Sequence, residues 1–311
     1  MQFFVLLCLL CASQLLANKK YDLPVLPDMT TMLEAMKKLD GPYLNATSSK
    51  LSDYNKQIPR QIFLTMRDAP QKFEDLPPNI LRYLIHQRHW SSIIADNKYV
   101  NKFMNEVFAN TSVLWAYNSI NPDLFAARAD IWRYSVLYAY GGVYIDADAS
   151  FHANLDKFIL PSDKFILSCE GNKMYPCYSP TYPLGQSPVL FDDYSILQWM
   201  IFSAPQHPFL AQTLLNVVAV VKSIYIRKSV VHTNLKLKFN TLICATGPAV
   251  FTHSIRQIIS STPNNTDTLG YRRAGTDYSD VRAKFKAAGL DGLHYTSLME
   301  HGVPLLHSLE Y

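Results

Sequence analysis

The sequence predicts an α/β fold with a mostly parallel central sheet. Short apolar segments alternate with longer segments whose apolar residues recur at helical spacing, which is typical of strands joined by crossover helices. Hydrophobic residues make up 49% of the 311 residues and charged residues 17%, against about 25% charged in an average soluble domain. We therefore expect one large folded domain with an extensive apolar core.

The expected elements follow one another along this domain. A buried strand at residues 62–65 comes after Pro59, and a helix at residues 79–97 separates it from a second strand at residues 111–117. The second half is expected to contain a strand at 164–168, helices near 195–202, 209–226 and 248–260, and a polar turn region at 262–280.

The N-terminus has the features of a targeting segment. Residues 1–17 are apolar without a charged side chain, and Lys19 and Lys20 follow them. The segment is shorter than the ~20 residues of a spanning helix, which predicts a cleaved signal peptide or a short signal-anchor. Residues 18–57 contain prolines and polar runs and predict a stem or linker, so the folded domain would cover residues 58–311. We expect this domain to face the Golgi or ER lumen of the secretory pathway, with membrane association if the N-terminal segment is retained.

Charge and cysteine content add constraints. The balance of 29 Lys+Arg against 25 Asp+Glu gives +4 over the whole chain without a long basic block, so nucleic acid is not an expected partner. Cys169 and Cys177 enclose a short loop that a disulfide could close, or they are both thiols, and Cys244 is expected to be a buried thiol. Acceptor triplets for N-glycosylation begin at Asn45, Asn110 and Asn264.

A helix with clear start and stop signals occupies the middle of the chain. Asn121 is a suitable N-cap and Pro122 suits the first helical position, while two glycines at 141 and 142 end the helix. Asp130 and Arg133 lie three residues apart and share one face of this helix. They form either a surface ion pair, worth a few tenths of a kcal/mol, or part of a site.

Two carboxylates follow this helix at the end of an apolar strand. If residues 143–148 are extended, Tyr144, Asp146 and Asp148 point to the same side, with the two aspartate Cα atoms about 6.6 Å apart at ~3.3 Å per residue. Such like charges repel unless a cation lies beside them. Carboxylate oxygens select Mg²⁺, Mn²⁺ or Ca²⁺, and the carboxyl end of a parallel strand is where a nucleotide diphosphate is expected.

Residues 127–134 and 140–148 together closely resemble the Asp-x-Asp sugar-binding region of family 32 glycosyltransferases. That family includes fungal Golgi initiating α-1,6-mannosyltransferases and inositol phosphoceramide mannosyltransferases. The likeness extends to residues 58–65, to residues 204–210 and to the Thr-Gly-Pro motif at Thr246. The first strand lacks the family's His-Gln-x-Trp pattern, and the C-terminus resembles the family's ending only in part.

The resemblance implies a GT-A type fold with C-terminal helical additions and sugar transfer with retention of configuration. Asp146 would face the ribose and the metal, and Asp148 would ligate Mn²⁺ or Mg²⁺. Asp130 and Arg133 would bind the donor sugar and the diphosphate, beside a wall shaped by two further residues, Gly142 and Tyr144.

The resemblance also suggests partners and a late metal ligand. His307 is the best candidate among nine histidines, because GT-A enzymes often recruit a histidine near the end of the domain, although a structural role stays open. The donor would be GDP-mannose or a UDP-sugar carrying galactose or N-acetylglucosamine, and the acceptor a glycan or glycolipid. Two other hypotheses are an inactive lumenal glycan-binding protein and a nucleotide-sugar hydrolase.

Overall fold

The computed structural model describes residues 43–44, 57–70, 72–170, 195–231, 239–261, 269–276 and 284–285. The two largest α-helices are α6 (Phe125–Tyr140) and α8 (Pro208–Val231), which contact each other. The other elements are β1 (Tyr43–Leu44), β2 (Gln61–Thr65), the 3-10 helix η2 (Phe73–Asp75), α3 (Pro78–His86), β3 (Ser91–Ala95), α4 (Asn97–Val107), α5 (Ser112–Ser119), β4 (Gly142–Ile145), β5 (Ala149–Ser150), α7 (Leu155–Phe158), β6 (Phe165–Cys169), β7 (Met200–Ser203), α9 (Phe239–Ala245), α10 (Pro248–Ser261), β8 (Tyr271–Thr276) and β9 (Lys284–Phe285).

The main sheet has seven strands in the order β1-β3-β2-β4-β7-β6-β8. Strand β2 is parallel to β3 and to β4, and β6 is parallel to β8, whereas β1 and β7 run antiparallel to their neighbours. Because β7 reverses direction between β4 and β6, those two strands again point the same way. Strands β2, β3, β4, β6 and β8 therefore end at one edge of the sheet, as expected for a mostly parallel GT-A type sheet.

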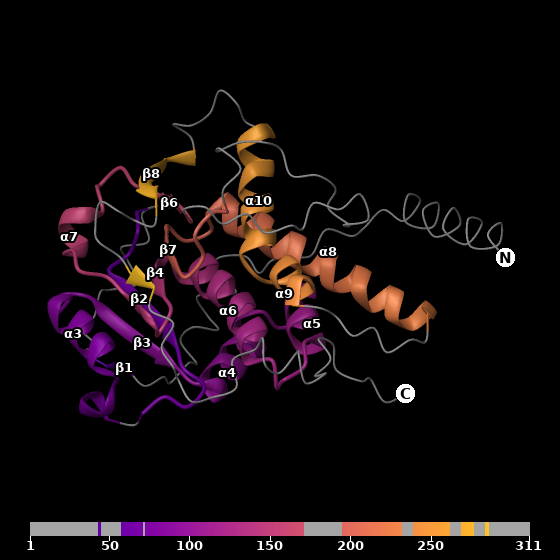
Figure 1. Cartoon of the computed structure of the whole chain (residues 1–311), viewed down its shortest axis with the longest axis horizontal. Coiled ribbons are helices and arrows are strands. Elements are labelled where there is room, and N and C mark those ends of the chain that lie inside the picture. Colours follow the sequence, from indigo (N-terminus) through magenta and orange to yellow (C-terminus); the bar gives the residue numbers. More distant parts are fainter. Residues whose placement is uncertain are drawn as a thin grey trace.

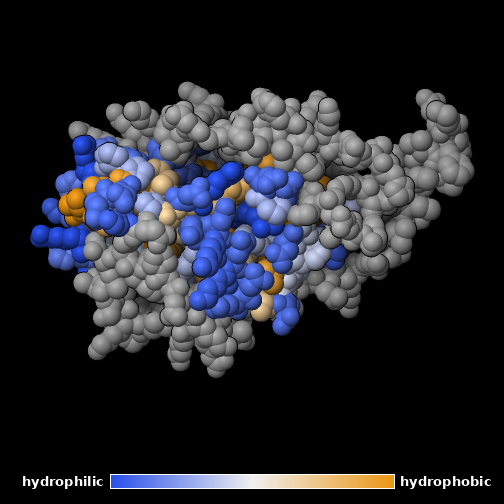
Figure 2. Space-filling model, turned by 90° about the horizontal axis from the view of Figure 1, so that it is seen from below, coloured by the Kyte–Doolittle hydropathy of each residue, from blue (hydrophilic) through white to orange (hydrophobic). Residues whose placement is uncertain are grey.

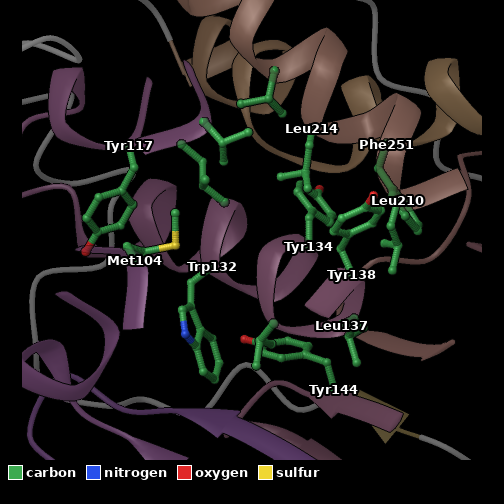
Figure 3. Packing of buried hydrophobic residues seen from close by; sticks show 14 of the residues in the cluster. Met104, Tyr117, Trp132, Tyr134, Leu137, Tyr138, Tyr144, Leu210, Leu214 and Phe251 are labelled. Carbon is green, nitrogen blue, oxygen red and sulfur yellow. The ribbon is translucent and has the colours of Figure 1, made fainter. Parts of the chain in front are cut away.

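Apolar side chains alternate between the two faces of this sheet. In β4, Tyr144 belongs to the larger core cluster with α4, α5, α6, α8 and α10, whereas Val143 and Ile145 belong to the smaller cluster with α3. Figure 1 shows these helices grouped on one side of the sheet, with α3 and α7 on the other. In Figure 3, Trp132, Tyr134 and Leu137 of α6 lie between Tyr144 of β4 and the α8 side chains Leu210 and Leu214. The predicted α/β class with C-terminal helical additions is confirmed.

Helix α6 is a core helix and not a surface helix. Almost every residue from Ala127 to Tyr140 is buried, and the helix ends at Gly141 with φ +65°. A Cβ on Gly142, at φ +107°, would lie 2.5 Å from the backbone oxygen of Gln61. The paired glycines thus let β4 leave the helix sharply and approach β2, so the predicted stop is confirmed. The predicted start is wrong, because Asn121 Oδ1 accepts from Asp123 N within a turn and the N-cap is Leu124.

Two predicted elements are wrong in type, and two are wrong in extent or content. The expected helix at 79–97 ends at His86, and strand β3 follows it. The expected strand at 111–117 is helix α5, whose first turn is capped because Thr111 Oγ1 accepts from Leu114 N at 3.2 Å. Residues 195–202 are extended up to β7, and β8 lies inside the expected turn region. Strand β3 is fully buried, so its apolar residues carry no clear period that would distinguish them from a continued helix. The strands at 62–65 and 164–168 and the helices at 209–226 and 248–260 are confirmed.

Two further expectations concern cysteines. Of the two alternatives for Cys169 and Cys177, the disulfide between them is wrong, because Cys169 takes no part in a disulfide. Cys244 is disulfide-bonded and is not the expected thiol, and its partner lies outside the described residues.

The described surface gives little sign of an apolar docking area. On the face shown in Figure 2 it is mostly hydrophilic, with small hydrophobic areas. Within the described ranges, Ile85 and Leu160 are the exposed large hydrophobic residues. One described helical window, Pro208–Tyr225 in α8, is long and apolar enough to cross a membrane, and half of it is buried inside the folded chain, so by itself it is weak evidence for a membrane span. The N-terminal targeting segment lies outside the described residues.

Candidate active site

The predicted site residues converge at the carboxyl end of β4. Arg133 Nη2 on α6 lies 2.9 Å from Asp146 Oδ1 just beyond β4, and 3.2 Å from Asp130 Oδ1 one turn earlier on the helix. Asp130 and Arg133 are each only 6% exposed. The interpretation as a surface ion pair is therefore wrong, and the pair belongs to a buried polar cluster.

Tyr144 supports this cluster from the strand. Its hydroxyl donates to Asp146 Oδ1 at 2.7 Å and lies 3.0 Å from Thr65 Oγ1 at the end of β2. The Arg133 guanidinium lies over the Tyr144 ring, 4.6 Å from its centroid. Thr65 is a site residue that the sequence analysis missed, although its place at the end of the first strand could have indicated it.

Two other buried side chains join the cluster from distant segments, and Tyr134 of α6 connects them. Gln198 Nε2 donates to Asp130 Oδ1 at 3.2 Å and to Tyr134 Oη, and Thr246 Oγ1 donates to Asp130 Oδ2 at 3.0 Å. Tyr134, which stacks on Phe251 and lies beside it in Figure 3, donates to the Thr246 carbonyl at 2.9 Å. Gln198 had no sequence signal, because its segment was predicted to be helical, whereas Thr246 stood in the recognised Thr-Gly-Pro motif.

Asp148 does not lie on the strand. Strand β4 ends at Ile145, and a turn closed by a hydrogen bond from Ala149 N to the Asp146 carbonyl contains Asp148. The expectation that residues 143–148 are extended is therefore wrong beyond Ile145. The side chain of Asn79, on α3, donates to the Ala147 carbonyl at 2.9 Å and so fixes the turn between the two aspartates.

The electrostatics of this cluster favour a cationic ligand. Burial raises the pKa of Asp130 to about 7, although Arg133 opposes the shift. Burial and the Asp146 charge raise the pKa of Asp148 to about 6, and burial raises the pKa of Asp146 as well. Burial lowers the pKa of Arg133, but the surrounding carboxylates more than offset this, and it stays charged. Three carboxylates thus face one guanidinium.

Asp146 and Asp148 fit a divalent cation. They offer hard oxygen ligands, and a cation would relieve the repulsion that raises the pKa of Asp148. Asp146 Oδ1 already accepts from Arg133 and Tyr144, so Oδ2 is the oxygen left to it. Within the described ranges, no group of three or more His, Cys, Asp or Glu residues is arranged to hold a metal ion. A cation bound by Asp146 and Asp148 would therefore need further ligands. His307, the expected late ligand, lies outside those ranges.

Comparison with known proteins agrees with this geometry. Residues 31–166 match the family described as glycosyltransferase sugar-binding region containing DXD motif. The chain is similar to an initiation-specific alpha-1,6-mannosyltransferase of Candida albicans, 22% identical over 78% of this chain and 61% of the relative. It is also similar to inositol phosphoceramide mannosyltransferase 1 of Schizosaccharomyces pombe, 27% identical over 52% of this chain and 43% of the relative.

The chain thus spans about two fifths to three fifths of the length of these curated relatives. Among solved structures, the PaToxG glycosyltransferase aligns with 16% identity over 77% of this chain and 82% of that chain, at a TM-score of 0.41. The resemblance to family 32 that the residues predicted is confirmed, and Asp146, Asp148 and the buried pair all lie inside the matched region.

Proposed function

We propose that this DXD-containing chain is a metal-dependent retaining glycosyltransferase. It moves mannose from GDP-mannose to a glycan or glycolipid acceptor in the secretory pathway. The observation that carries the proposal is the convergence of Asp146 with the buried pair Asp130 and Arg133 at the carboxyl end of β4, with Asp148 in the turn that follows directly. The similarity to two mannosyltransferases supports the choice of sugar.

The chemistry of the cluster suits a diphosphate leaving group. A divalent cation held by Asp146 and Asp148 would supply Lewis-acid stabilisation of the charge that develops on the diphosphate. Arg133 adds charge-assisted hydrogen bonding, because its buried Nε–H has no acceptor within the described part of the chain. A buried, unpaired N–H costs about 1–3 kcal/mol, so an anionic ligand that accepts from it is favoured.

The surroundings of Asp130 bear on the stereochemical course. Its carboxylate accepts from Arg133, Gln198 and Thr246, which holds both oxygens in place and makes it a poor nucleophile. This supports a front-face route in which the acceptor hydroxyl attacks beside the departing diphosphate. In that route Asp130 orients Arg133 and forms no bond to the sugar.

The test is turnover with purified protein, Mn²⁺ and a panel of nucleotide sugars, with released nucleotide measured with and without sugar acceptors. We expect acceptor-dependent release of GDP from GDP-mannose that EDTA abolishes. Release from a UDP-sugar alone would move the donor to the UDP class, and equal release without acceptor would indicate a hydrolase. Binding of glycans without release from any donor would indicate an inactive glycan-binding protein and refute the proposal.

A further inference from the structure

Asp130 is enclosed by two side chains from elements far away in the sequence. Gln198, in the segment that leads into β7, donates from Nε2 to Oδ1 at 3.2 Å. Thr246, directly after α9, donates from Oγ1 to Oδ2 at 3.0 Å. Gln198 is 6% exposed and Thr246 is fully buried. Each oxygen of the Asp130 carboxylate therefore accepts from a neutral donor, and Oδ1 also accepts from the guanidinium of Arg133.

Gln198 also holds the cationic partner. Its backbone carbonyl accepts from Arg133 Nη1 at 3.1 Å, so one residue contacts both members of the buried pair. Tyr134 Oη joins Gln198 to the Thr246 carbonyl and closes the group. The guanidinium is thereby held by Gln198 on one nitrogen and by two carboxylates on the other.

We propose that Gln198 and Thr246 are positioning residues that fix Asp130 and, through it, the orientation of Arg133 against Asp146. This inference rests on the proposed function for its kinetic consequence. Arg133 has charge-assisted bonds to two carboxylates, and Asp130 could rotate about its side chain if its neutral donors were absent. If Asp130 rotated, Arg133 would rotate with it and would form poorer hydrogen bonds to the charge that develops on the diphosphate. Such misplacement lowers kcat more than it weakens binding of the donor in the ground state.

Matched substitutions separate positioning from simple stabilisation. Gln198→Glu keeps the shape, removes the donor and adds a charge next to Asp130, and Thr246→Val removes the hydroxyl. Gln87→Glu is the matched control, because Gln87 is 3% exposed and donates to the Ala153 carbonyl at 2.8 Å, far from this cluster. Thr213→Val controls for a buried threonine whose hydroxyl bonds the Phe209 carbonyl within α8.

The kinetic readout is kcat and KM for the donor. We expect Gln198→Glu and Thr246→Val to lower kcat by roughly tenfold to a hundredfold with KM changed less than about threefold, and both controls to stay near wild type. When Gln198→Glu is combined with Arg133→Lys, kcat should fall by less than about threefold below that of Arg133→Lys alone, because the effects of residues that act as a unit are not additive. Full additivity, or equal losses in the controls, would overturn the proposal.

A second readout does not depend on turnover. In protein labelled with ¹⁵N-arginine, the Arg133 guanidinium signals, assigned by their loss in Arg133→Lys, should show slow rotation in wild type and in Gln87→Glu. In Gln198→Glu, rotation of the Arg133 guanidinium should be fast enough to average these signals. Unchanged Arg133 rotation in Gln198→Glu would overturn the positioning role even in an active enzyme. An inactive wild type whose Arg133 still loosens in Gln198→Glu would instead refute the proposed function and support the positioning role.

Discussion

The substitution Arg133→Lys tests the buried cluster directly. It keeps the positive charge and removes the planar fork, which in the wild-type protein reaches Asp146 at 2.9 Å, Asp130 at 3.2 Å and the Gln198 carbonyl at 3.1 Å. A single ammonium cannot reproduce these directions at once. The stacking of the guanidinium on the Tyr144 ring is lost as well.

The size of the effect follows from the hydrogen bonds that a lysine cannot make. If the lysine keeps its bond to one carboxylate, two hydrogen bonds to a charged group disappear, at about 1.5–3 kcal/mol each. Relaxation and water entry reduce the net loss of stability to roughly 2–4 kcal/mol, or roughly 5–15 °C in melting temperature for a domain of this size. Loss of one donor to the developing charge lowers turnover by about a hundredfold or more. If Asp130 and Arg133 were an exposed ion pair, Arg133→Lys would leave the melting temperature nearly unchanged. Because both residues are buried, we expect the melting temperature to fall.

The assay compares Arg133→Lys with Arg128→Lys. Arg128 lies on the same helix, donates twice to the Ile120 carbonyl at 3.1 Å and 2.8 Å, and stacks on Tyr117, but it contacts no carboxylate of the cluster. Nucleotide release is measured well below both melting temperatures, and folding is checked by circular dichroism. We expect both variants to lose stability and Arg133→Lys alone to lose turnover. The reasoning is refuted if Arg133→Lys keeps more than about a tenth of wild-type turnover, a loss below ~1.4 kcal/mol.

The other predictions concern the metal, its turn, acid stability and the compartment. Asp148→Asn should lower Mn²⁺-dependent turnover at least about a hundredfold with the fold intact, and a tenth of wild-type rate remaining would contradict the metal assignment; Asp146 is a less clean target because it pairs with buried Arg133. Asn79→Ala should raise the Mn²⁺ midpoint by roughly fivefold, as expected for one hydrogen bond of about 1 kcal/mol, and an unchanged metal titration would show that this contact does not support the turn. Burial lowers the pKa of His207 to about 4, so between its unfolded pKa of about 6.5 and pH 4 the unfolded state takes up a proton that the folded state excludes. The raised pKa values of Asp130 and Asp148 act in the opposite direction, and they do so in wild type and in His207→Gln alike. The free energy of unfolding of wild type relative to His207→Gln, measured with urea, should therefore fall by about 3 kcal/mol as pH drops from 6.5 to 4, and a difference that does not change with pH would contradict this role of His207. Protein secreted from eukaryotic cells should carry a glycan at exposed Asn110, seen as a mobility shift that Asn110→Gln removes, and an unglycosylated, cytosolic product would contradict the lumenal assignment.

Local signals in the sequence were sufficient for one part of this structure. The glycine pair after α6, the apolar strand and the two aspartates are neighbours along the chain, so their chemistry could be inferred from spacing alone. The first strand and the long helices of the second half were likewise predicted, because segment length separates the two types: β2 has 5 residues after a proline, whereas α8 and α10 have 24 and 14.

Other features depend on contacts that sequence spacing does not contain. The side chains of α6 are apolar on all sides, so no periodic face indicated that Asp130 and Arg133 are buried. Residues 111–117 have the β-branched and aromatic composition of a strand, but the cap by Thr111 and packing against α8 make them helical. Gln198 was missed because its segment was predicted to be helical, whereas in the structure it leads into strand β7.

The long sequence separation inside the cluster has a consequence for how the chain reaches its native state. Asp130 and Thr246 are 116 positions apart, and Arg133 and Gln198 are 65 apart. Loops of that length close slowly, since their entropy is lost before any contact compensates for it. An intermediate in which α6 already packs on β4 would bury Asp130 and Arg133 before Gln198 and Thr246 can form hydrogen bonds with them. Because buried charged groups with too few partners are costly, we expect this side of α6 to be buried late in folding. The region matched by the family model ends at residue 166, before Gln198 and Thr246. A fragment cut at that boundary would contain the carboxylates and the arginine without the groups that hold them, and we would not expect it to fold into a working site.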